Sequence, residues 1–168
     1  KNVGLSDWVP DKIYISSLWT WAWKPVHDSV LQCRRLYPGA EVSVGGIYAS
    51  MTPDHARESG ADIIHEGLVR ESEDLLPMYE LVPGWNEDKS KRASIMFSSR
   101  GCIRKCEFCI VPKLEGKPFK SRASTTIKHL IYPGHKRVIL WDNNILGESD
   151  WQGVVKELIE LGLPVDFN

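Results

Sequence analysis

The sequence predicts an α/β protein in which two parallel sheets follow one another along the chain. Apolar stretches that suit short strands alternate with amphipathic stretches that suit helices, and this alternation is typical of parallel sheets with crossover helices. A polar, turn-rich stretch over residues 83–92 interrupts the alternation and suits a domain boundary. We therefore expect a first domain over residues 1–82, a linker over residues 83–92 and a second domain over residues 93–168.

Three strands and three helices are expected in the first domain. The strands cover residues 11–17, 41–44 and 61–64, and the helices cover residues 25–37, 52–60 and 71–76. Pro25 suits a first helical turn and Gly60 suits a helix end. Cys33 lies on the apolar stripe of the first helix, which favours a core position over a ligand role. This order of elements indicates a Rossmann-like parallel sheet.

The second domain has the pattern of the first half of a β/α barrel. Its strands are expected over residues 93–99, 137–141 and 164–168, and its helices over residues 124–132 and 149–161. The apolar run over 137–141 suits a strand that is buried on both faces. A capping box over residues 149–152 opens the last helix. The buried face of that helix is expected to hold Trp151, Val155, Leu158 and Ile159.

Composition and charge exclude several classes of protein. A formal net charge of −1 at pH 7 gives no global basic field that would recruit nucleic acid. No apolar run approaches the ~20 residues of a membrane span, and no charged-then-apolar signal peptide opens the chain. Three of the four cysteines lie in one loop, which is not a disulfide framework. We therefore expect a soluble, cytoplasmic protein without a membrane partner.

The cysteines of this loop, Cys102, Cys106 and Cys109, have the spacing C-x3-C-x2-C and follow a predicted strand. Thiolates this close together repel one another unless a metal neutralises them, and thiolate is a preferred ligand of iron–sulfur clusters and zinc. A structural zinc site needs four closed ligands, so His129 or His135 would have to complete it. Three ligands on a four-iron cluster would instead leave one iron open. A group of free thiols is the remaining alternative.

The stretch from Gly101 to Cys109, Gly-Cys-x3-Cys-x-Phe-Cys, resembles the cluster loop of the radical S-adenosylmethionine (SAM) superfamily. The resemblance implies that Cys102, Cys106 and Cys109 hold a [4Fe–4S] cluster whose open iron chelates the amino and carboxylate groups of SAM. It implies that Phe108 lies against the adenine. It also implies a reaction in which one electron cleaves SAM to methionine and a 5′-deoxyadenosyl radical, which abstracts hydrogen from an unreactive carbon.

The end of the second barrel strand carries the next residues that the resemblance implicates. In radical SAM enzymes this position binds the SAM amino group, usually through a Gly-Gly-Glu motif, which this chain lacks. Asp142 and Asn143 stand there and offer the acceptors that an ammonium group needs, so the resemblance assigns them this role. Turn chemistry after a strand is the alternative for an Asp-Asn pair.

In the first domain, Ser16-x-Leu18 is followed after 26 residues by Gly45-Gly46, which resembles the second and third signatures of cobalamin-binding domains. There the serine and the glycine pair admit the nucleotide tail of cobalamin at the carboxyl edge of the sheet. Glycines at a strand end let backbone approach a ligand closely. The first signature, D-x-H-x-x-G, is absent and would fall before Lys1. We expect either an incomplete cobalamin-binding-type domain or one that binds no cobalamin.

The resemblance as a whole implies a radical SAM enzyme, incomplete at both ends, with cobalamin-dependent methyl transfer as an outcome if cobalamin binds. Such an enzyme takes electrons from a donor such as flavodoxin or ferredoxin. One alternative is a tRNA or protein methylthiotransferase, which Cys109-Ile110-Val111-Pro112 and Ser121-Arg122 resemble, and only this alternative implies a nucleic-acid partner. Another is an iron–sulfur or zinc module without turnover. The sequence does not identify the substrate.

Overall fold

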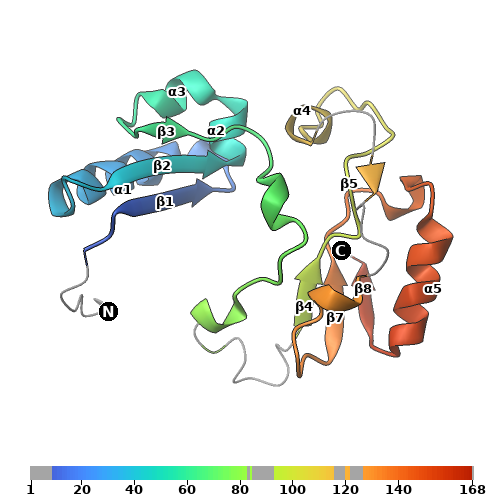
Figure 1. The fold of residues 1–168 in the computed structure, drawn as a ribbon. Helices are drawn as coiled ribbons and strands as arrows, with labels where there is room; N and C mark the ends of the chain where they lie inside the picture. The colour runs from blue at the N-terminus through green and yellow to red at the C-terminus, as the bar shows by residue number, and fades with distance from the viewer. Residues whose placement is uncertain (1–8, 83, 85–92, 116–119, 122–126, 168) are drawn as a thin grey trace. The chain divides into compact units, whose positions relative to one another are not determined.

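The structure is a computed structural model that describes residues 9–82, 84, 93–115, 120–121 and 127–167 (Figure 1). It divides into two compact units, Lys1–Leu68 and Val69–Asn168, each with a small parallel sheet, so the chain is of the α/β class. The predicted linker over 83–92 lies outside the described residues except for Gly84. The division falls before it because residues 70–82 make their contacts with the second unit. None of the helices in the described ranges is long and apolar enough to cross a membrane.

The first unit contains a three-stranded parallel sheet in the order β1-β2-β3. Its elements are β1 (Lys12–Ser17), η1 (Thr20–Ala22), α1 (Trp23–Leu36), β2 (Glu41–Gly46), α2 (Ile47–Met51), α3 (Pro53–Arg57) and β3 (Ile63–Ile64). The three predicted strands and the first predicted helix are confirmed. The helix predicted over 52–60 is instead two short helices that meet at Thr52, and helical structure begins at Ile47, directly after the glycine pair.

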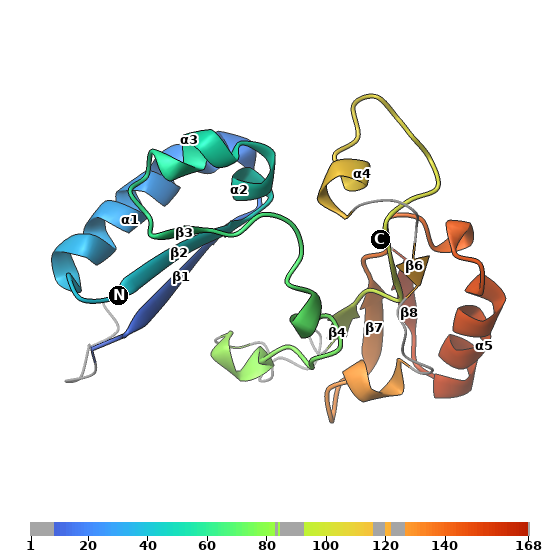
Figure 2. The same cartoon turned by 45° about the horizontal axis from the view of Figure 1, so that its top comes forward.

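One face of this sheet is covered by α1, α2 and α3, which lie on the same side of it in Figure 2. Val42 and Val44 of β2 are fully buried there against Val26 and Val30 of α1. Because side chains alternate across a strand, the residues between them face the other way. Tyr14 of β1 is 77% exposed on that second face. Cys33 packs against the buried cluster from α1, as predicted.

The second unit contains a three-stranded parallel sheet in the order β4-β7-β8 and a two-stranded antiparallel ladder of β5 and β6. Its elements are η2 (Arg70–Ser72), η3 (Tyr79–Leu81), β4 (Ala93–Met96), β5 (Ser99–Arg100), α4 (Val111–Leu114), β6 (Lys120–Ser121), η5 (Lys128–Leu130), β7 (Arg137–Leu140), η6 (Ile145–Gly147), α5 (Trp151–Leu161) and β8 (Val165–Phe167). Strands are therefore confirmed at all three predicted places.

Two predicted helices are wrong or only partly visible. The stretch 71–76 forms a single 3-10 turn, η2, in place of a helix. Of the helix predicted over 124–132, residues 124–126 lie outside the described residues, and the remainder holds only η5.

The faces of α5 and β7 also differ from the prediction. Leu158 of α5 is buried, and Val154 and Leu161 pack on the same core, whereas Ile159 is 73% exposed. The helix therefore presents residues spaced by four and three, as a single stripe requires. Of β7, only Val138 and Leu140 are buried, because α5 and η5 cover one face of this sheet alone.

Ser149 bonds to the neighbouring Glu148 and does not cap α5. The hydroxyl of Ser149 donates to a Glu148 carboxylate oxygen at 3.0 Å, so the predicted capping box does not form.

The hydroxyl of Tyr79 accepts from the amide of Ile95 at 2.7 Å and donates to its carbonyl at 3.3 Å. Burial raises the pKa of Tyr79, so the hydroxyl keeps its proton for this contact.

Gly46 is required by the packing of β1 on β2. It adopts φ +90°, and a Cβ added to it would lie 2.4 Å from the backbone oxygen of Ser17. We expect Gly46→Ala to destabilise the first unit by at least the about 1–3 kcal/mol that such a backbone conformation costs a non-glycine residue. Gly45→Ala is the matched control, because its Cβ would meet its nearest neighbour at 3.7 Å, an ordinary contact. Urea denaturation of both variants tests this, and equal stabilities would contradict it.

The carboxylate of Asp62 links the start of β2 to α1 and makes the stability of the first unit sensitive to acid. Asp62 accepts from Arg34 at 2.5 Å and from the amide of Val42 at 2.7 Å, and these contacts lower the pKa of Asp62. A carboxyl with a lowered folded-state pKa stabilises the fold above its unfolded value of about 3.9, and this contribution disappears as the pH falls through the folded value. Asp62→Asn should therefore be less stable than the parent at pH 6, and the difference should shrink towards pH 2. A difference independent of pH, in urea denaturation across this range, would contradict the assignment.

Candidate functional site

The loop that carries the three cysteines begins at the end of β5, beyond the carboxyl end of β4, and is tied at its base. Ser99 and Arg100 of β5 pair with β6, so the chain leaves and returns at the same place. The carboxylate of Glu115, at the end of α4, also accepts a hydrogen bond from the amide of Gly101. The loop therefore projects from a fixed base at the carboxyl end of β4, the edge at which ligands bind in parallel α/β folds.

The three thiols are free and accessible within this loop. Cys102 and Cys109 are half-buried and Cys106 is exposed, and none forms a disulfide. The amide of Cys109 donates to the carbonyl of Cys106 at 3.0 Å, which turns the loop between these two residues. The sulfur of Cys102 accepts from Asn144 Nδ2 at 3.6 Å and from the amide of Arg104 at 3.4 Å.

The donor chemistry of the loop fits a cluster or another thiophilic metal, although its geometry is not that of a closed site. Among the residues that the structure describes, no three His, Cys, Asp or Glu side chains are grouped tightly enough to hold a metal ion. Soft thiolate donors nevertheless select iron–sulfur clusters and zinc, and no disulfide competes for them. Phe108 is 94% exposed, so its ring has no partner in the loop to cover it.

Neither of the histidines that could complete a three-cysteine zinc site is grouped with the loop thiols among the described residues. His135 is buried, and its Nδ1 lies 3.0 Å from the hydroxyl of Ser94 in β4. His129 is in η5 and is exposed. His135 precedes β7, and Ser94 is near the start of β4, so His135 is at the amino end of the sheet, opposite the cysteine loop.

Asp142, directly after β7, binds the chain at the entry to the loop. Its carboxylate accepts from the amide and hydroxyl of Ser98 at 2.8 and 2.6 Å and from the amide and hydroxyl of Ser99 at 2.7 and 2.6 Å. Three of these donors meet Oδ2 and only the amide of Ser98 meets Oδ1, so Oδ1 keeps one lone-pair position for a further donor. The role of Asp142 towards an ammonium group stays a prediction, and the structure gives it a second role in fixing β4 to β7.

Asn143 belongs to a network of charged groups under the loop. Its Nδ2 lies 3.1 Å from both carboxylate oxygens of Glu115, which also lies 3.4 Å from Arg100. Arg100 makes a bidentate pair with Glu73 at 2.7 and 2.8 Å and stacks on Phe97 with its guanidinium carbon 3.4 Å from the ring centre. The side chains of Arg100, Glu73 and Glu115 are 22%, 18% and 5% exposed, so the network is largely shielded from water.

Sequence reasoning missed Glu73, Arg100 and Glu115 as parts of the site. Arg100 stands beside the cysteine motif and Glu115 follows Cys109 by six residues, whereas Glu73 is distant in sequence, and neither glutamate carries a spacing signal. It also missed Glu148, after η6, which is 2% exposed and has one carboxylate oxygen without a hydrogen-bond partner among the residues that the structure describes. An acidic residue that follows the apolar pair Ile145-Leu146 is the only local signal for its burial.

The residues predicted to admit a cobalamin tail are neighbours in the first unit. The β1–β2 register pairs Ser16 with Gly45 and Ser17 with Gly46 at the carboxyl ends of the two strands. Ser16 and Leu18 line a shallow hollow of about 340 Å³, and Leu18 is 60% exposed. The stacked rings of Trp19 and Trp21, 4.8 Å apart, follow directly in the chain. The sheet edge therefore presents apolar and aromatic surface beside the serine.

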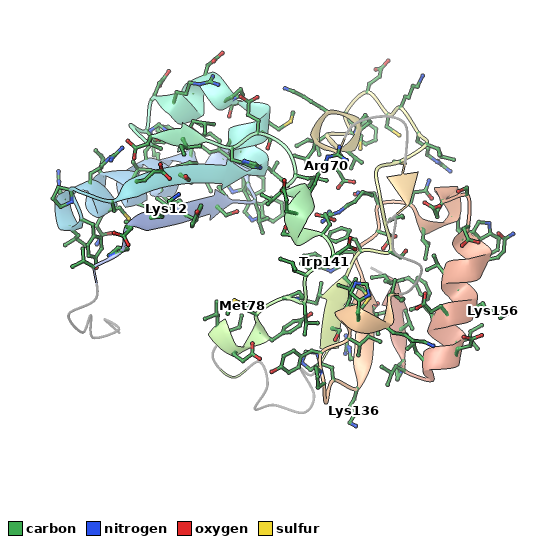
Figure 3. The ribbon with its side chains drawn as sticks, viewed as in Figure 1. Lys12, Arg70, Met78, Lys136, Trp141 and Lys156 are labelled. Atoms are coloured by element: carbon green, nitrogen blue, oxygen red, sulfur yellow. The ribbon has the colours of Figure 1, made fainter. Side chains whose placement is uncertain are left out.

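A larger hollow of about 400 Å³ lies in the second unit beside Arg100. Its walls are mainly apolar and include Phe97, Met78 and Trp141, of which the last two are labelled in Figure 3. Met78 is 67% and Trp141 45% exposed. The guanidinium of Arg100 is already neutralised by its two glutamates, so this hollow offers apolar contact and no free charge from that residue.

Comparison with known proteins gives no relative: no family model, no curated protein and no solved structure matches this chain. The function therefore has to be inferred from the chemistry of the chain's own residues. The most specific of these are the three thiols of the loop, because their number and spacing restrict the ligands that they can hold.

Glu115 is expected to hold the base of the cysteine loop. Glu115→Ala removes the acceptor of the Gly101 amide and of the exposed Asn143, and the buried Gly101 amide left unpaired costs roughly 2 kcal/mol. Amide hydrogen exchange over residues 101–115 should become faster in this variant. Glu107→Ala, an exposed glutamate of the same loop, is the matched control. The same exchange rates in both variants would refute this role of Glu115.

Proposed function

We propose that this chain belongs to a radical SAM enzyme and holds a [4Fe–4S] cluster through Cys102, Cys106 and Cys109. The observation that carries the proposal is three free thiols in one C-x3-C-x2-C loop. Their place after a strand of a parallel sheet supports it, because the carboxyl ends of such strands are where β/α enzymes build their sites. Three protein ligands leave one position of a four-iron cluster for a substrate.

The loop contributes binding and orientation in this proposal. Cys102, Cys106 and Cys109 supply the thiolates, and the 94%-exposed Phe108 supplies an apolar face for the adenine of SAM. Asn143 and Asp142 stand at the next strand end, where a SAM ammonium would be held. The chemistry that the bound cofactors supply is the one-electron cleavage of SAM to methionine and a 5′-deoxyadenosyl radical.

The finer fold is part of the same proposal. Parallel strands in the order β4-β7-β8, with α5 between the last two, are compatible with the first strands of a radical SAM β/α barrel. The order β1-β2-β3 with helices after each of the first two strands is compatible with a Rossmann-like, cobalamin-binding-type domain. Ser16, Leu18, Gly45 and Gly46 would then adjoin the cobalamin tail, and methyl transfer would be the outcome.

Two alternatives make different demands on the same loop. A methylthiotransferase would use nucleic acid or protein as substrate, and a structural iron–sulfur or zinc module would show no turnover. Neither is favoured by a contact among the described residues. An electron donor such as flavodoxin or ferredoxin, and a cytoplasmic location, follow from the radical SAM proposal and are proposed with it.

Replacement of each loop cysteine tests the cluster directly. After anaerobic reconstitution with iron and sulfide, Cys102→Ala, Cys106→Ala and Cys109→Ala should each lose most of the iron and the visible absorption of the parent. Cys33→Ala, which removes a thiol from the core of the first unit, is the matched control and should retain the cluster. Iron, sulfide and zinc analysis with visible spectra measures both.

The metal content and colour of the parent and its variants distinguish the proposed function from its alternatives. A colourless protein that binds zinc in place of iron would support the structural module and overturn the radical SAM proposal. Full iron content in any of the three loop variants would also overturn it. Cleavage of SAM by the reduced parent without added substrate would support it beyond cluster binding.

A further inference from the structure

Two histidines of the first unit meet the hydroxyl of one buried tyrosine, and none of the three residues has a part in the proposed function. The hydroxyl of Tyr48 lies 3.0 Å from Nε2 of His27 and 2.7 Å from Nδ1 of His55. His27 is on α1, Tyr48 on α2 and His55 on α3, so each donor comes from a different helix. Two imidazole nitrogens are thereby held within hydrogen-bonding distance of one phenolic oxygen.

The rings of this cluster are held in place by packing. Tyr48 is 1% exposed, while both imidazoles are half-buried and so remain accessible on one side. Trp23 meets both imidazoles edge-on, with ring centres 5.4 Å from His27 and 5.0 Å from His55. The two imidazole centres lie 5.3 Å apart. A buried anchor and a shared aromatic neighbour fix the donors before any ligand arrives.

We propose that His27, Tyr48 and His55 form a binding site for a divalent transition-metal ion such as Zn²⁺. Imidazole nitrogen and anionic oxygen are ligands that zinc, copper and nickel accept. Bonds of about 2.0–2.2 Å in a tetrahedral arrangement separate the ligand atoms by roughly 3.4 Å. The present separations from the phenolic oxygen, 3.0 and 2.7 Å, are shorter than this by about 0.4 and 0.7 Å, so the half-buried imidazoles would rotate away from the buried Tyr48 to admit the metal. The accessible side of the imidazoles leaves a fourth position for water.

The carboxylate of Glu58 lies near the second ring nitrogen of His55. Nε2 of His55 lies 4.0 Å from a carboxylate oxygen of Glu58, one turn further along the chain. Histidines that bind metals through one ring nitrogen commonly direct the other nitrogen to a carboxylate, which fixes the tautomer and the ring. The Glu58 side chain is 69% exposed and can move closer without disturbing the core.

Metal binding here exchanges one proton and no electrons. Burial, and after it the negative charge of Glu58, raises the pKa of Tyr48, so the hydroxyl is protonated in the free cluster. Coordination forms a metal–oxygen bond, breaks the O–H bond and releases that proton to solvent. The imidazole that donates to the oxygen moves its own proton to its other ring nitrogen.

Titration of the full chain tests the site. Because the loop thiols also bind zinc, the host carries Cys102, Cys106 and Cys109 replaced by serine, and the unsubstituted chain is titrated beside it. Calorimetry with Zn²⁺ and visible absorption with Co²⁺ should each show one equivalent in the host. His27→Ala, His55→Ala and Tyr48→Phe should weaken binding at least tenfold. His65→Ala, an exposed histidine of the same unit, is the control and should leave the affinity unchanged.

An NMR measurement on the host itself, which has no substitution at His27, Tyr48 or His55, does not depend on whether the variants fold. Co²⁺ added to the host should broaden the imidazole NMR signals of His27 and His55 and leave those of His65 sharp. Absence of binding at millimolar metal, broadening of His65 to the same degree, or binding that survives all three substitutions would each overturn the site. The outcome is independent of the iron–sulfur proposal, since the host has no loop thiols.

Discussion

Four hydrogen bonds to the Asp142 carboxylate fix the point at which the chain passes from β4 into the cysteine loop. The serines that donate them, Ser98 and Ser99, are 3% and 1% exposed, so water does not compete for these charge-assisted bonds. Asp142 is itself placed by the pairing of β4 with β7, which aligns Met96 with Leu140. The direction in which the loop leaves the sheet thus follows from the register of two buried strands.

The sequence predicted the strands better than the helices, and it did not reveal the network of charged groups around the thiols. Strands such as β2 and β7 were found because Val and Ile concentrate where a sheet is buried, and this signal is local. The buried face of α5 was misassigned because an apolar Ile159 is exposed, and exposure depends on what the sheet leaves uncovered. Local pattern also cannot give the contacts of Glu115 with Gly101 and Asn143, because they join residues far apart in sequence.

Gly46 shows why a short motif needs a structural account before a functional one. The resemblance to cobalamin-binding domains gives the glycine pair a ligand-binding role. The structure supplies another cause, since any side chain at Gly46 would collide with the backbone of Ser17 whether or not a ligand is present. Gly45 is under no such constraint, so a ligand role is easier to separate from a folding role at Gly45 than at Gly46.

The contact between Tyr79 and Ile95 has a consequence for how this chain meets other proteins. In the described sheet β4 is an outer strand, and an outer strand whose amide and carbonyl groups are unpaired invites a strand from another molecule to add to it. The Tyr79 hydroxyl occupies both groups of Ile95, so an incoming strand would first have to displace a largely apolar side chain from its place. The segment that carries Tyr79 thereby opposes self-association along β4. Its removal would leave the amide and carbonyl of Ile95 free to pair with a strand of another molecule.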